Sequence, residues 1–228
     1  MTDPTHGYEL VTDDAAAWEP AVAAAVDALA AGLLVVVPTE TVHGIAARPD
    51  LPGATERVFA AKRRDRELGL PVLTATGTEA LGLAAPGGTA AERLAAAFWP
   101  GPLTMVLPRG RRSYGWSLGQ QTKTIGVRVP AHPVALELLR RTGPLAVTSA
   151  NRSGRPPLAT LADLVETFGD DVAVYLVDPE ADPSGAASTV VDLTGGAPSV
   201  VRHGPIDEHH LRAVAEGTEP PSQRLPAR

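Results

Sequence analysis

Residues 33–44, LLVVVPTETVHG, join a run of apolar residues to a polar turn. The first five are apolar and mostly β-branched, which predicts a strand buried in a sheet. Pro38 has no backbone N–H to donate to a neighbouring strand, so the strand is expected to end there. The hydroxyl and carboxylate groups of Thr39, Glu40 and Thr41 follow at once. Ligands bind at such strand ends in open α/β sheets, and an ordinary surface loop is an equally good reading of these residues alone.

Helical and extended patterns alternate along the rest of the chain. The spacing of apolar residues predicts helices over 13–31, 51–64, 90–98, 133–141, 161–168 and 207–215. Strands are expected at 33–37, 70–73, 103–107, 124–129, 145–148 and 172–177, and a hairpin is expected from 188–193 and 199–203. This alternation predicts an α/β domain with a mixed sheet and flanking helices.

The composition changes at the two ends of the chain. Residues 1–14 are expected to form a flexible lead-in, 15–206 a single domain, and 207–228 a terminal helix followed by a disordered tail. Within the domain, residues 109–121 are rich in arginine and contain glycine, which predicts a mobile, solvent-exposed loop.

The charge of the chain limits the class of ligand. Its 228 residues carry a formal net charge of -6, which disfavours broad affinity for nucleic acids. Basic residues nevertheless cluster at 57–66 and 109–112, a pattern that suits a small anionic ligand. There is no cysteine, so disulfides, thiolate nucleophiles and cysteine metal ligands are excluded. No Lys or Arg precedes Arg48, so the N-terminus lacks the basic residues of a signal or transit peptide. No stretch approaches the roughly 18 apolar residues of a membrane span. We therefore expect a cytoplasmic protein without a membrane segment.

Several familiar catalytic motifs are missing from the sequence. It contains neither G-x-x-x-x-G-K-[ST] nor a G-x-G-x-x-G that opens a helix, which argues against the common phosphate loops. It also lacks H-E-x-x-H, the zinc signature of many metalloproteases. What remains are short polar turns after predicted strands, at 39–41, 149–153 and 188–189, together with the cations Lys62, Arg64, Arg128 and Arg202.

Arg128 lies between Val127 and Val129 in a predicted strand. An unpaired buried charge is costly, so the guanidinium must reach either solvent or a partner. Two readings are open. The residue faces solvent from an edge strand, or its planar fork binds a carboxylate or a phosphate.

Seven short motifs occur in an order that is specific as a set, although each one alone is weak. They are PTETVHG at 38–44, K-x-R at 62–64, WPGPLT at 99–104, GVRVP at 126–130, SAN-x-SG at 149–154, STVVD at 188–192 and R-x-G at 202–204. Together they resemble the YrdC-like family, the L-threonylcarbamoyladenylate synthases of tRNA t6A biosynthesis. The resemblance implies a twisted, open mixed sheet with flanking helices and a large concave cleft, and it makes residues 15–206 the catalytic domain.

The resemblance also implies a reaction and its partners. ATP, bicarbonate and L-threonine would give threonylcarbamoyl-AMP and pyrophosphate, an adenylyl transfer in which Mg²⁺ enters with the phosphates of ATP and no resident metal is needed. The product would pass to a downstream threonylcarbamoyl transferase complex, and a weak contact with tRNA is left open. No membrane contact is expected.

Matching positions carry the family's roles onto this chain. The resemblance assigns the triphosphate to Lys62 and Arg64, which are also the expected catalytic residues. Thr39 and Arg128 are expected to bind threonine. The remaining nucleotide-binding residues would be Ser149, Asn151, Ser188 and Arg202. A displacement at phosphorus needs alignment and charge neutralisation more than a covalent nucleophile, so cations and hydroxyls suit it.

Three positions depart from the family's pattern. His43 stands where a tyrosine is usual, Asp65 where proline is common, and Ala75 where some relatives carry a histidine. These departures leave the acceptor amine open. Two other readings therefore remain, a related carbamoyl-adenylate transferase acting on another acceptor and a non-catalytic paralogue that binds double-stranded RNA. The first normally needs fused domains that supply carbamoyl phosphate, and the second would be expected to lose nucleotide-binding residues that are all present here.

Overall fold

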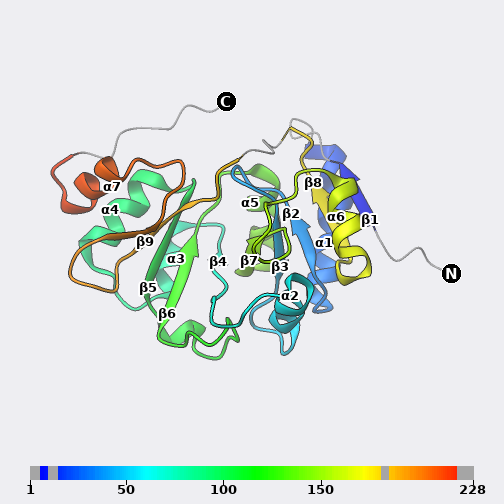
Figure 1. The fold of residues 1–228 in the computed structure, drawn as a ribbon, viewed down its shortest axis with the longest axis horizontal. Helices are drawn as coiled ribbons and strands as arrows, with labels where there is room; N and C mark the ends of the chain where they lie inside the picture. The colour runs from blue at the N-terminus through cyan, green and yellow to red at the C-terminus, as the bar shows by residue number, and fades with distance from the viewer. Residues whose placement is uncertain (1–5, 10–14, 181–184, 220–228) are drawn as a thin grey trace.

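The computed structural model describes residues 6–9, 15–180 and 185–219 (Figure 1). Within these ranges ten strands form one mixed sheet in the order β1-β8-β2-β3-β7-β4-β6-β5-β9-β10. The strands are β1 (His6–Glu9), β2 (Val35–Val37), β3 (Gly44–Ala47), β4 (Val72–Leu73), β5 (Leu103–Pro108), β6 (Thr124–Arg128), β7 (Leu145–Ser149), β8 (Val174–Val177), β9 (Thr189–Asp192) and β10 (Ser199–Arg202). The helices are α1 (Ala15–Ala30), α2 (Ala54–Lys62), α3 (Gly77–Leu83), α4 (Gly88–Phe98), α5 (Pro133–Thr142), α6 (Leu161–Phe168) and α7 (Glu208–Glu216), with 3-10 turns η1 (Arg111–Ser113) and η2 (Gly169–Asp171). Parallel pairs β1–β8, β8–β2, β4–β6 and β5–β9 occur beside antiparallel pairs, which confirms the predicted mixed sheet.

Strand β2 shows why helices cover both faces of the sheet. Val35 and Val37 pack in one buried cluster with α1 and α5, whereas Val36 packs in a second cluster with α2 and α6. Successive side chains of a strand point to opposite faces, so an unbroken apolar run predicts a strand buried on both sides. Figure 1 shows these helices around the part of the sheet that contains β8, β2, β3 and β7.

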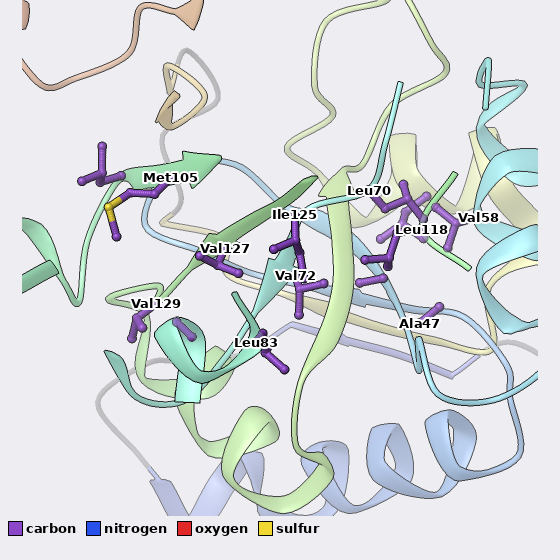
Figure 2. Close-up of a cluster of buried hydrophobic side chains, with 14 of the residues drawn as sticks. Ala47, Val58, Leu70, Val72, Leu83, Met105, Leu118, Ile125, Val127 and Val129 are labelled. Carbon is purple, nitrogen blue, oxygen red and sulfur yellow. The ribbon is translucent and has the colours of Figure 1, made fainter. Parts of the chain in front are cut away.

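The rest of the sheet, from β6 to β10, packs with α3, α4 and α7 (Figure 1). Figure 2 shows one buried cluster that runs from Met105 and Val127 through Val72 to Leu118 and Val58. The cluster crosses the two-residue strand β4 and makes both parts of the sheet share one core. The hairpin predicted from 188–193 and 199–203 is confirmed as the antiparallel pair β9–β10.

The ends of the chain differ in part from the prediction. Residues 6–9, expected within a flexible lead-in, form β1, which pairs in parallel with β8 through backbone groups. Such pairing needs no apolar run, so the sequence pattern does not reveal it. The terminal helix α7 packs against α4, with Leu211 and Val214 buried in the main core. Residues 220–228 of the predicted tail and the rest of the lead-in lie outside the described residues.

Two further elements lie where the sequence predicts none. Strand β3 follows the PTET turn, and its Gly-Ile-Ala-Ala composition carries little strand signal. Its Gly44 lies so close to β7 that a Cβ would be 2.5 Å from Val147 Cγ1. Helix α3 begins after Thr76, whose hydroxyl accepts a hydrogen bond of 3.2 Å from the backbone N–H of Glu79.

The prediction of a solvent-exposed loop at 109–121 is wrong for four of its residues. Arg109, Gly110, Ser113 and Leu118 are buried. The Arg109 guanidinium donates hydrogen bonds to the carbonyls of Ser113 and Trp116, and the Ser113 hydroxyl donates to Leu83 O at 2.9 Å. The arginine is therefore an internal anchor that satisfies carbonyls of its own loop, and composition alone does not distinguish such an anchor from a surface charge.

Candidate active site

One cleft of about 330 Å³ collects most of the predicted site residues. On β5, Thr104 and Val106 face the cleft, while the alternate residues Leu103, Met105 and Leu107 face the core. The volume lies within the range of sites for small molecules. The predicted residues that line the cleft are Thr39, Arg64, Arg128, Ser149, Ser188 and Arg202.

Three arginines converge on this cleft from different elements. Arg64 follows α2, Arg128 ends β6 and Arg202 ends β10. Burial, followed by the charges of Arg128 and Arg64, lowers the pKa of Arg202. Among the described residues that line the cleft there is no Asp or Glu. The cleft lining therefore carries positive charge, partly balanced at Arg128 by Glu40 outside the lining, and this favours an anionic ligand.

The end of α2 places Arg64. Arg63 adopts a left-handed conformation with φ of 50° and ends the helix, and the backbone N–H of Arg64 donates to Phe59 O at 2.9 Å. The Arg64 side chain then donates from Nε to Leu68 O at 3.0 Å and from Nη2 to Gly69 O at 3.3 Å. These bonds orient the guanidinium at the cleft, and burial lowers its pKa.

Arg128 meets a carboxylate from the PTET turn. Its Nη2 donates to Glu40 Oε1 at 2.7 Å and to Thr41 Oγ1 at 3.1 Å, and its Nε donates to Gly101 O at 3.1 Å. The side chain is only 7% exposed. Of the two readings left open by the sequence, the structure supports a buried guanidinium with a carboxylate partner, at a position that lines the cleft.

The Thr39 hydroxyl shapes the turn on which Glu40 and Thr41 lie. It donates to Val42 O at 2.6 Å and accepts from the backbone N–H groups of Thr41 and Val42 at 3.3 and 3.2 Å. The hydroxyl that accepts a hydrogen bond from Arg128 belongs to Thr41, a residue of the same polar turn for which the sequence predicts no role. Its place next to Thr39 in a polar turn is the signal that points to it.

Ser188 and Arg202 form a second polar corner. Arg202 donates from Nε to Ser188 O and from Nη2 to Ser188 Oγ, both at 2.9 Å, and the Ser188 hydroxyl lies 2.8 Å from Thr104 Oγ1. Gly204 allows this approach, because a Cβ there would lie 2.3 Å from Thr189 N and 2.5 Å from Ala187 O. This close contact explains why the motif pairs an arginine with a glycine two residues later.

The structure places Lys62 and Asn151 next to the cleft and not in its lining. Lys62 is 1% exposed and Asn151 is 7% exposed. The ammonium donates to oxygens of Ser149 and Asn151, so these two side chains lie behind the cleft wall that Ser149 forms.

The three departures from the family's pattern also lie away from the cleft lining. His43 is buried, and its Nε2 accepts a hydrogen bond from the backbone N–H of Asp178 at 3.2 Å, while burial lowers its pKa. Asp65 is exposed and accepts from the Glu67 backbone N–H at 2.9 Å. Ala75 lines a separate hollow beside Trp99. None of the three is part of the cleft lining, although His43 lies between the lining residues Val42 and Gly44.

Other chemistries find little support in the described ranges. Residues 115–119, G-W-S-L-G, match the G-x-S-x-G pattern of the hydrolase nucleophile elbow, in which the serine lies on a turn between a strand and a helix. Here Ser117 lies instead in the loop after η1, and its hydroxyl donates to Glu56 Oε1 at 2.7 Å. Within residues 6–9, 15–180 and 185–219, no group of three or more His, Cys, Asp or Glu side chains is placed to hold a metal ion. In the same ranges no helix combines the length and the apolar character needed to cross a membrane.

Comparisons with known proteins identify the family of the chain. The family model Sua5_yciO_yrdC, described as "Telomere recombination", matches residues 27–204. A Mycobacterium tuberculosis protein provisionally named threonylcarbamoyl-AMP synthase is 43% identical over 195 residues, 85% of this chain and 88% of that protein. The threonylcarbamoyl-AMP synthase of Bacillus subtilis is 33% identical over 205 residues, 90% of this chain and 59% of that protein. The crystal structure of Pyrococcus abyssi Sua5 complexed with L-threonine superposes with a TM-score of 0.76 at 31% identity, covering 92% of this chain and 59% of that one. The chain belongs to the Sua5/YciO/YrdC family.

Proposed function

We propose that the chain catalyses the formation of threonylcarbamoyl-AMP and pyrophosphate from ATP, L-threonine and bicarbonate. Relatives that carry the name threonylcarbamoyl-AMP synthase support this reaction, as does a related structure solved with L-threonine. The observation in this chain that carries the proposal is the convergence of Arg64, Arg128 and Arg202 on one cleft whose described lining has no carboxylate.

The chemistry requires two steps. The amine of threonine first adds to CO2, in equilibrium with bicarbonate, and loses a proton to give a carbamate. One carbamate oxygen then forms a bond to the α-phosphorus of ATP, while the bond from that phosphorus to the bridging oxygen breaks and its electron pair leaves with pyrophosphate. This adenylyl transfer makes the chain a nucleotidyltransferase, and Mg²⁺ enters as part of the substrate MgATP.

The cleft suits this displacement because it supplies charge and alignment. Negative charge develops on the leaving pyrophosphate and on the oxygens around phosphorus, and fixed cations stabilise it without reorganising. We assign the phosphates to Arg64, Arg202 and Ser188. Ser149 Oγ, whose own hydrogen goes to Asn151 Oδ1, is assigned to the nucleotide as an acceptor. We assign the threonine carboxylate to Arg128, with Thr39 shaping the turn beside it. The mixed anhydride is an activated acyl group, so we place a threonylcarbamoyl transferase acting on tRNA downstream.

The direct test is incubation with MgATP, bicarbonate and each amino acid in turn, followed by mass detection of the adenylate and measurement of pyrophosphate. Threonine is expected to give the threonylcarbamoyl-AMP mass in an amount that depends on bicarbonate. A product with another amino acid in place of threonine would make the chain a carbamoyl-adenylate transferase for that acceptor. No adenylate with any amino acid would refute the proposal.

Gly204→Ala is expected to weaken ATP binding by about ten- to a hundredfold, because a Cβ displaces Arg202 from Ser188 and removes charge-assisted hydrogen bonds. Titration calorimetry with MgATP measures the change. Gly196→Ala is the matched control, since Gly196 is exposed and a Cβ there meets no atom within 4 Å. Equal ATP affinity in the two variants would remove the Arg202 and Ser188 corner from the nucleotide site.

A further inference from the structure

Lys62 uses its ammonium inside the protein. Its Nζ donates to Ser149 O, to Asn151 O at 2.7 Å and to Asn151 Oδ1 at 3.1 Å. A lysine ammonium has three N–H groups, so these three acceptors engage all of them. The side chain is 1% exposed and is absent from the lining of the cleft. In this arrangement no N–H of Lys62 is left for a phosphate.

Asn151 connects Lys62 to the cleft wall. Its Oδ1 accepts from Lys62 and also from the Ser149 hydroxyl, at 2.6 Å. Its Nδ2 donates to the carbonyls of Arg152 and Arg155. The amide therefore has a fixed orientation within the turn. The ammonium binds the backbone carbonyl of Ser149 directly and orients the Ser149 hydroxyl through Asn151. Ser149 lines the cleft.

Backbone contacts tie the same turn to the end of α2. The N–H of Ser153 donates to Lys62 O at 2.9 Å, and the Arg152 guanidinium donates to Ala61 O. These bonds satisfy carbonyls that the last turn of a helix leaves without intrahelical partners. The helix end and the turn are thus held together by groups that do not depend on the Lys62 side chain. The ammonium is therefore not needed to dock the turn on the helix, and its bonds instead set the local positions of Ser149 and Asn151.

We propose that Lys62 is a positioning residue that fixes Ser149 and Asn151 for nucleotide binding and does not itself contact the phosphates. This inference rests on the proposed function, which makes ATP the ligand of the cleft. It divides the K-x-R motif into two roles. Arg64 presents charge to the ligand, while Lys62, two residues earlier, binds oxygens of Ser149 and Asn151 and holds the cleft wall.

The chemistry of Lys62 makes its location measurable. Burial and the charge of Arg64 lower the pKa of Lys62 to about 7. An amine that reagents can reach is acylated at pH 8 through its unprotonated fraction, whereas an amine enclosed by the protein is acylated only when the turn opens. The chain offers an internal reference, because Lys62 and Lys123 are its only lysines and Lys123 is exposed.

The first experiment acetylates the wild-type chain at pH 8 with an N-hydroxysuccinimide ester and follows each lysine by peptide mass spectrometry. Lys62 is expected to react at least about tenfold more slowly than Lys123, both with and without MgATP, because reaction requires local opening of the turn. Rapid labelling of Lys62 that MgATP suppresses would place the amine in the cleft and overturn the proposal.

The second experiment is a double-mutant cycle on ATP affinity. Lys62→Met and Asn151→Ala are each expected to weaken MgATP binding by about tenfold, and the double variant to bind no worse than the weaker single one, because both act through the same turn. Lys123→Met is the control and is expected to bind normally.

Lys62→Arg is expected to remain impaired in MgATP binding, since the larger planar guanidinium does not fit three convergent oxygens. The KM for threonine is expected to stay within about twofold of the wild-type value in Lys62→Met, which separates positioning of the nucleotide from general loosening of the fold.

The outcomes separate this inference from the proposed function. Additive losses in the cycle, or normal MgATP binding by Lys62→Arg, would mean that Lys62 does not act through Asn151 and would overturn the inference. Wild-type protein that binds no MgATP would refute the proposed function instead. The labelling of wild-type protein decides the location of Lys62 even if a variant fails to fold, which circular dichroism reveals.

Discussion

Arg64→Met is expected to lower kcat for pyrophosphate release by about 10²- to 10³-fold, the loss typical of removing one fixed donor to developing charge. Arg64 lines the cleft, and its side chain is oriented by the carbonyls of Leu68 and Gly69. Methionine keeps much of the length of the side chain and removes its charge. Release of pyrophosphate in a coupled assay, at saturating threonine and bicarbonate, measures the effect.

Arg63→Met is the matched control for Arg64→Met. Arg63 carries the same charge one residue earlier, is exposed, and does not line the cleft. We expect its kcat to stay within about threefold of the wild-type value, as is usual for a surface substitution. Equal losses in the two variants would mean that general positive charge, and not the placed guanidinium of Arg64, accelerates the reaction.

Arg128→Met is expected to raise the KM for threonine by about 10²-fold and to leave the KM for ATP within about threefold of the wild-type value. Removing one partner of a buried charged pair commonly costs about 2–5 kcal/mol. Steady-state kinetics with each substrate varied in turn separates the two constants. An unchanged KM for threonine would remove Arg128 from the threonine site.

Glu40 requires its own control, because it pairs with Arg128 at 2.7 Å. Arg128→Met leaves this carboxylate without its cation beside the cleft, where it would repel the carboxylate of threonine. The double variant Glu40→Gln with Arg128→Met removes that repulsion. If lost attraction to Arg128 dominates, threonine binding stays weak in the double variant. Recovery of threonine binding would instead assign the effect of Arg128→Met to the unpaired Glu40.

The sequence predicts those parts of the fold whose cause is local. The run at 33–37 specifies β2 because three successive valines are buried on alternate faces. The hairpin β9–β10 follows from two extended runs joined by a Gly-rich turn. Strand β1 depends on pairing with β8, a partner far along the chain, so the sequence of its own four residues does not predict it.

The residues of the candidate site also fall into those that the local sequence predicts and those that depend on distant contacts. The polar turns at strand ends identify Ser149, Ser188 and the neighbourhood of Thr39 as cleft residues, and the structure brings them together. The direction of Lys62 depends instead on oxygens 87 and 89 residues away, which local spacing does not contain. Leu118 and Gln121 line the cleft from a segment whose arginine-rich composition suggests only exposure.

We propose that one cleft holds ATP and threonine side by side between three arginines. A crystal structure of the chain with L-threonine and a non-hydrolysable ATP analogue tests it most directly. We predict the threonine carboxylate within about 3 Å of the Arg128 guanidinium, and phosphate oxygens at similar distances from Arg64 and Arg202. Electron density for either ligand outside this cleft, or for threonine bound without Arg128, would contradict the account.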